Sequence, residues 1–105
     1  MSVTHHCQFT IKTQSPPLVE VDQNAAAFYV RFKKGKVHRT IPRMMSPMVV
    51  TIDLDGKGEV VGIEAVGADG LSIAQILEIA KVEAPHIDLG RAVIGRAGMK
   101  MPQPA

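Results

Sequence analysis

The run from residue 22 to residue 66 constrains the fold most, because it is built from segments with a period of two that are separated by glycine-containing turns. Such alternation is typical of strands with one buried and one solvated face. Gly62, inside the last segment, indicates that another backbone or side chain approaches closely there. The run predicts an antiparallel meander whose strands span 26–32, 36–41, 48–54 and 61–65, with a first hairpin that turns at 34–35 and a second at 55–58.

The period changes after residue 70. Ile73, Ile76, Leu77 and Ala80 have the spacing of an amphipathic helix, and Ser72 with Gln75 forms a capping box at its start. A helix of this length needs the sheet for stability, so it should lie on the apolar face. The predicted fold is α+β, a four- to five-stranded antiparallel meander with one C-terminal helix packed on one face.

The 105 residues suffice for one domain. Residues 1–21 are expected to be an N-terminal extension that includes a candidate edge strand, residues 22–84 the domain, and residues 85–105 a largely flexible tail rich in glycine and proline. Only four residues are aromatic, so the core has little bulk, and we expect a homodimer or higher oligomer to bury more surface.

The cysteine count and the hydropathy of the chain indicate the cellular compartment in which the protein is expected. Cys7 is the single cysteine, which leaves no partner for an intramolecular disulfide. No apolar run approaches the roughly 20 residues that span a bilayer. A cytoplasmic protein without membrane insertion is expected.

Charge is distributed unevenly along the chain. Residues 31–43 carry six Lys or Arg and no carboxylate, whereas residues 44–90 carry eight carboxylates and two Lys. The basic run could steer an acidic partner, bind nucleic acid phosphates, or pair with carboxylates across the sheet.

Three methionines between two strands form a flexible apolar group of the kind that adapts to a partner, although the same residues could instead fill the core. The candidate partner-binding surface combines this group with one aromatic and three arginine side chains: Tyr29, Arg31, Arg39, Arg43, Met44, Met45 and Met48.

Catalytic, metal and cofactor chemistry find little support. His5, His6 and Cys7 are residue types that bind metal ions, and His38 or His86 could complete such a site. Adjacent residues on a strand point to opposite faces, however, which argues against one site from all three. The stretch 53–59 begins like a calcium loop yet has Lys57 where an oxygen ligand is needed. Neither Cys7 nor Ser46 lies in a nucleophile motif. We therefore predict a non-enzymatic protein without a metal or a cofactor.

Part of the chain resembles a bacterial family catalogued as domain of unknown function 2283. The resembling residues are Asp22, 26–32, 35–37, Thr40, 50–55 and 58–64, which includes EVVGIE. The resemblance implies a fold class and a bacterial or archaeal origin, and some relatives look like members of toxin–antitoxin pairs. The chain departs from the family at 42–48, where acidic residues usually stand.

These features predict a small self-associating module that binds a partner protein, in an antitoxin-like role. The alternatives are a nucleic-acid-associated protein that uses the basic first hairpin, and a protein that binds a small ligand or a metal.

Overall fold

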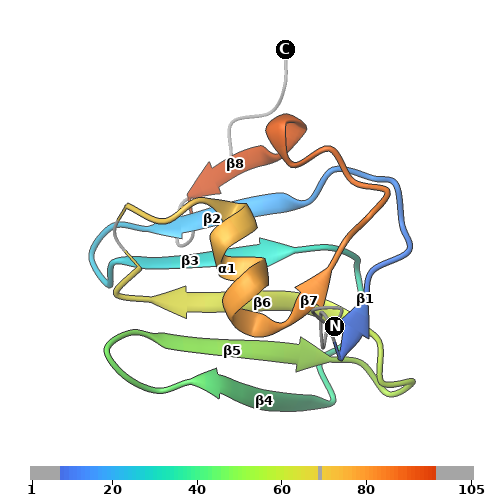
Figure 1. Ribbon diagram of the computed structural model, residues 1–105, viewed down its shortest axis with the longest axis horizontal. Coiled ribbons are helices and arrows are strands. Elements are labelled where there is room, and N and C mark those ends of the chain that lie inside the picture. The colour runs from blue at the N-terminus through green and yellow to red at the C-terminus, as the bar shows by residue number, and fades with distance from the viewer. Residues whose placement is uncertain (1–7, 69, 97–105) are drawn as a thin grey trace, which may run out of the picture.

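The protein is seen in a computed structural model that describes residues 8–68 and 70–96. It is an α+β fold in which five antiparallel strands form a sheet and one helix covers one face, as predicted (Figure 1). A sixth strand extends the sheet in parallel, so that the order is β4-β5-β6-β3-β2-β8. The strands are β2 (Leu18–Asp22), β3 (Ala27–Arg31), β4 (Arg39–Met44), β5 (Val49–Leu54), β6 (Val60–Val66) and β8 (Val93–Arg96).

The predicted first hairpin is wrong. β3 pairs with β2 and β6, and the chain after Arg31 crosses the ends of β6 and β5 before β4 forms the far edge of the sheet. The backbone N–H of Phe32 donates to Val61, and that of His38 donates to Leu54, so the crossing segment (residues 32–38) is bonded to both strands that it passes. The second hairpin, β5 to β6, turns at 55–58 as predicted.

The helix α1 (Ile73–Ala80) begins at the predicted capping box. The Ser72 side chain accepts from the N–H of Gln75, and the Gln75 side chain accepts from the N–H of Ser72. Lys81 ends the helix in a left-handed conformation. No helix among the described residues has the length and apolar character needed to cross a membrane.

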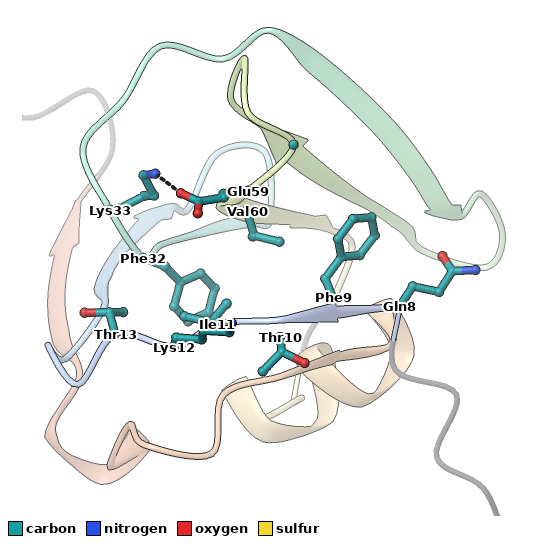
Figure 2. A pocket seen from close by; sticks show the side chains of 11 residues that line it. Gln8, Phe9, Thr10, Ile11, Lys12, Thr13, Phe32, Lys33, Glu59 and Val60 are labelled. Atoms are coloured by element: carbon teal, nitrogen blue, oxygen red, sulfur yellow. Dashed lines mark hydrogen bonds and ion pairs between the residues drawn. The ribbon is translucent and has the colours of Figure 1, made fainter.

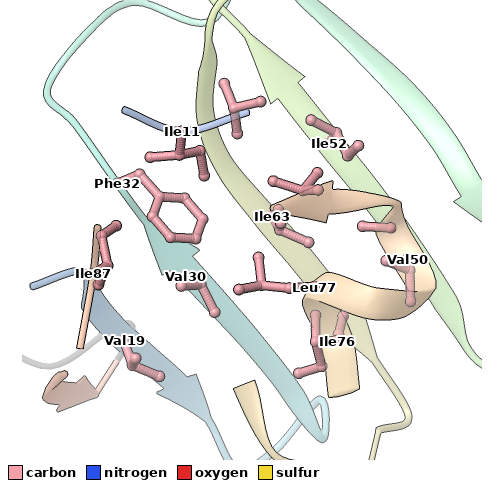
Figure 3. Close-up of a cluster of buried hydrophobic side chains, with 14 of the residues drawn as sticks. Ile11, Val19, Val30, Phe32, Val50, Ile52, Ile63, Ile76, Leu77 and Ile87 are labelled. Atoms are coloured by element: carbon pink, nitrogen blue, oxygen red, sulfur yellow. The ribbon is translucent and has the colours of Figure 1, made fainter. Parts of the chain in front are cut away.

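The core lies between α1 and the sheet (Figure 3). Ile76 and Leu77 point from the helix toward the strands, where Val30, Ile52 and Ile63 are at most 1% exposed. The apolar alternation predicted for β3, β5 and β6 therefore supplies the sheet side of this core.

Both ends of the described chain take part in the structure. Strand β1 (Phe9–Thr10) pairs in parallel with β7 (Val82–Glu83), which follows α1 directly. Strand β2 lies between β3 and β8 and is not an edge strand, and the 3-10 helix η1 (Leu89–Arg91) leads into β8 at the edge. The expected edge position of β2 is thus wrong, and the structure places η1 and β8 within the predicted tail. The flexibility expected of residues 85–105 stays a prediction. Pairing between strands this distant in sequence leaves no local signal.

Candidate functional site

The sheet face opposite α1 is not covered by any other described element (Figure 1). Because paired residues of neighbouring strands point to the same face, the register assigns this open face its side chains. It carries the carboxylates of β2, β5 and β6 and the polar residues of β3, β4 and β5, which are Glu20, Asp22, Tyr29, Arg31, Thr40, Thr51, Asp53 and Glu64. We call this set the open face.

A row of hydrogen bonds crosses the open face. The phenol of Tyr29 on β3 donates to Oδ2 of Asp53 on β5 at 2.8 Å, although β6 lies between these strands. The hydroxyl of Thr40 on the edge strand β4 donates to Oδ1 of the same carboxylate at 2.7 Å. Both Asp53 oxygens are thereby occupied, and three strands are joined through one carboxylate.

Gly62 on β6 allows the Tyr29 side chain to reach across this strand to Asp53. A Cβ at this position would lie 2.4 Å from the ring and hydroxyl of Tyr29, so the ring passes directly over the bare backbone of β6. The close approach predicted at Gly62 is confirmed, and its partner is Tyr29.

The surroundings of Tyr29 favour its neutral form. Burial raises the pKa of the Tyr29 phenol well above its ordinary 10.0, and the hydrogen bond to Asp53 and the charge of that carboxylate raise it further. The guanidinium of Arg31 lies 5.1 Å from the ring centroid, and its charge acts in the opposite direction. Arg31 Nε also lies 3.8 Å from Glu20 Oε1, which continues the polar row onto β2.

The crossing segment is anchored by Lys33. Its Nζ lies 2.7 Å from both Asp55 Oδ2 and Glu59 Oε1, at the two ends of the β5–β6 turn. The hydrogen bond from Lys33 is the largest cause that lowers the pKa of Asp55 to about 2, and the backbone N–H groups of Glu59 and Lys57 act in the same direction. An ammonium group thus stands beside the carboxylates that resemble the start of a calcium loop.

The other basic residues of the crossing segment and of the start of β4 carry unneutralised charge. Lys34, Lys36 and Arg39 are exposed, and no described carboxylate forms an ion pair with them. We call these three residues the basic stretch. They lie on the crossing segment and at the start of the edge strand β4, at one end of the sheet.

The structure separates the residues predicted to form one partner surface. Tyr29 and Arg31 are in contact on the open face. Arg43 lies at a bulge of β4, and its Nε donates to the carbonyl of Ala80 at the end of α1 at 2.9 Å. Arg39, a member of the basic stretch, begins the same strand on the edge of the sheet.

The methionines are divided as well. Met44 and Met48 are partly buried and pack against the core, which favours the core-filling alternative for these two. Met45 is 65% exposed. An exposed apolar contact at this loop would therefore depend on Met45.

A pocket of about 550 Å³ lies between the N-terminal segment and the β5–β6 turn (Figure 2). Phe9, Ile11, Phe32 and Val60 supply its apolar lining, and the Lys33–Glu59 pair lies at its border. Its volume is in the usual range of roughly 300–1,000 Å³ for small-molecule sites. No sequence motif indicated it, because its walls come from segments far apart in the chain.

Within residues 8–68 and 70–96, no three His, Cys, Asp or Glu side chains are grouped as a metal site would require. His5, His6 and Cys7 lie outside the described residues. Ser46 is exposed in the loop before β5.

Sequence reasoning missed several residues that organise the open face. The sequence pattern gives Asp53 and Thr40 no place in the predicted partner surface, although both are among the residues of the family resemblance. Both have polar side chains on predicted strands, which is a signal that they face away from the core. Their link to Tyr29 depends on strand order, which the local pattern does not contain.

The chain matches no protein-family model, no curated protein and no solved structure. The resemblance to the family of domain of unknown function 2283 stays a prediction.

Proposed function

We propose that the chain is a non-enzymatic, self-associating module that binds protein through the open face. The observation that carries this proposal is the row Thr40–Asp53–Tyr29, which holds polar side chains in fixed positions on a sheet face that no described element covers. A surface whose side chains are already ordered loses less conformational entropy on binding.

The open face has the composition of a polar protein interface rather than of a catalytic site. It presents an aromatic ring, an arginine and several carboxylates, and tyrosine and arginine are enriched where interfaces concentrate their binding energy. Each oxygen of Asp53 already accepts a hydrogen bond from within the chain, which gives this carboxylate a role in ordering the face.

Sedimentation over a range of protein concentrations tests the proposal. We expect a species heavier than the 11.3 kDa monomer, and we expect Glu64→Lys on the open face to weaken its association about tenfold or more. Glu78→Lys is the matched control, because Glu78 is exposed on α1 and undergoes the same change of charge. Monomers at every concentration, or equal effects of the two variants, would count against the proposal.

We propose a cytoplasmic, bacterial setting for this module, which the single cysteine and the family resemblance support. In the antitoxin-like form of the proposal, a second protein would occupy the open face. Co-purification from bacterial lysate after nuclease treatment, repeated with Glu64→Lys and Glu78→Lys, tests that form. A partner retained by both variants would bind elsewhere.

The pocket favours a second candidate function, binding of a small amphipathic ligand. Its apolar lining and the amine of Lys12 suit a fatty acid with a short hydrocarbon chain. A medium-chain fatty acid should then raise the unfolding temperature of the wild-type chain and have a smaller effect on Lys12→Gln. An unchanged unfolding temperature would remove this candidate.

A further inference from the structure

We infer that the open face binds the basic stretch of a second copy of this chain, in a two-fold dimer that contains this contact twice. The inference rests on the proposed self-association and identifies the two surfaces that meet. Its basis is that the described chain carries two unneutralised surfaces of opposite charge.

The open face is acidic. Four carboxylates and one guanidinium lie on it, so its net charge is −3; these residues are Glu20, Asp22, Asp53, Glu64 and Arg31. The nearest ion-pair approach on this face, Arg31 to Glu20, is 3.8 Å, and Glu64 is exposed without a described cationic partner. A partner that covers this face must therefore bring positive charge, because burying carboxylates without partners is costly.

The basic stretch supplies an equal and opposite charge. Lys34, Lys36 and Arg39 add to +3, and the neighbouring Lys33 is already occupied by Asp55 and Glu59. Its side chains are exposed on a segment that is bonded to the ends of β5 and β6, so the positive charges are presented from a fixed backbone.

Charge also selects between arrangements of the dimer. Two open faces stacked on one another would bring net charges of −3 together, and such like-charge contact is unfavourable. Within one copy, no ion pair among the described residues joins the basic stretch to a carboxylate of the open face. A two-fold axis brings the open face of each copy to the basic stretch of the other, which closes the assembly and leaves no free site for further growth.

Charge reversal on each surface tests the inference. Lys36→Glu with Arg39→Glu makes the basic stretch acidic, and Glu20→Lys with Glu64→Lys makes the open face basic. We expect each double variant to associate at least about tenfold more weakly than the wild-type chain, measured by sedimentation at low salt. An equimolar mixture of the two double variants should form a heterodimer, because one of its two contacts then carries the wild-type charges and the other carries opposite charges with the signs exchanged.

A matched control separates this contact from general attraction between oppositely charged proteins. Lys57→Glu with Lys81→Glu changes the net charge by the same amount at two other exposed lysines. This control should associate with itself like the wild-type chain, and its mixture with the open-face variant should form far less heterodimer, because only one of the two contacts is then favourable. Equal heterodimer formation with the control would overturn the inference.

Failure of the inference can be distinguished from failure of the proposed function. If the wild-type chain associates and Glu64→Lys weakens it, but reversal of the basic stretch has no effect, the proposed function stands and the inference is wrong. If the same reversal removes bound nucleic acid and leaves self-association unchanged, the basic stretch serves nucleic acid instead, and the inference is also wrong. A chain that is monomeric throughout would contradict both.

Discussion

Tyr29 crosses Gly62 so closely that a methyl group at residue 62 would lie 2.4 Å from the ring. Real Cβ atoms do not approach other heavy atoms to this distance, since dense packing does not permit overlap. The glycine is therefore required by the position of the ring, and the ring position places the phenol within 2.8 Å of Asp53 on the strand beyond. Because Gly62 has no side chain, Tyr29 on β3 can be linked to Asp53 on β5 across β6.

Gly62→Ala should lower the free energy of unfolding by about 1–3 kcal/mol, because the added methyl group displaces the Tyr29 ring and breaks its bond to Asp53. Denaturant-induced unfolding measures this change. In a Tyr29→Ala background, the same substitution should be neutral or stabilising, since alanine restricts the unfolded chain more than glycine does. An equal loss in both backgrounds would show that the ring is not the cause.

Ionisation of Tyr29 should require unusually alkaline solution. Burial, and then the bond to Asp53, raises the pKa of this phenol in the folded chain above the unfolded value of 10.0. The corresponding stability is complete below that value and declines as the pH rises through the folded pKa. Tyr29 is the sole tyrosine and the chain has no tryptophan, so an absorbance titration reports on this group directly. We expect Asp53→Asn to move the midpoint downward; an unchanged midpoint would contradict the assigned role of Asp53.

Strand positions could be predicted from the sequence because one buried face imposes a period of two on each strand. The alternation around Val30, Ile52 and Ile63 marks three strands, and all three residues are in the core. The capping box at Ser72 similarly located the start of α1, since both hydrogen bonds are local. Local periodicity and capping thus determine the elements and the face that each one buries.

Strand order could not be predicted in the same way. Lys34-Gly35 reads as a tight turn, yet Phe32 bonds to Val61 and the chain continues past β6 and β5. The gain that favours this path is long-range: it allows Lys33 to bind both ends of the β5–β6 turn and lets Gly35 pack near the buried side chain of Val61. The polar row of the open face depends on this order, which explains why Tyr29 was identified but its link to Asp53 was not.

The Lys33–Asp55 pair should contribute to stability in a pH-dependent manner. The pKa of Asp55 is lowered from 3.8 to about 2 in the folded chain, first by the hydrogen bond from Lys33. Its contribution is therefore present above pH 3.8 and is lost as the pH falls toward about 2. In Asp55→Asn and in Lys33→Met, denaturant midpoints measured across this interval should fall less steeply than in the wild-type chain. Parallel pH profiles for all three proteins would show that the pair does not lower this pKa.

The two neighbouring methionines should respond differently to a charge. Met44 packs against the core, so Met44→Asp places a carboxylate among apolar side chains and should cost about 2 kcal/mol or more in unfolding free energy. Met45 is 65% exposed, and Met45→Asp should change that free energy by no more than about 0.5 kcal/mol.

Because Met45→Asp leaves the fold intact, it isolates the contribution of the methionine loop to association. The proposed dimer buries the open face and the basic stretch, and Met45 belongs to neither, so sedimentation of Met45→Asp should match that of the wild-type chain. Weakened association of this folded variant would place the interface at the methionine loop instead. Met45→Leu provides the matched control, because it keeps an apolar side chain at the same position while it removes the thioether.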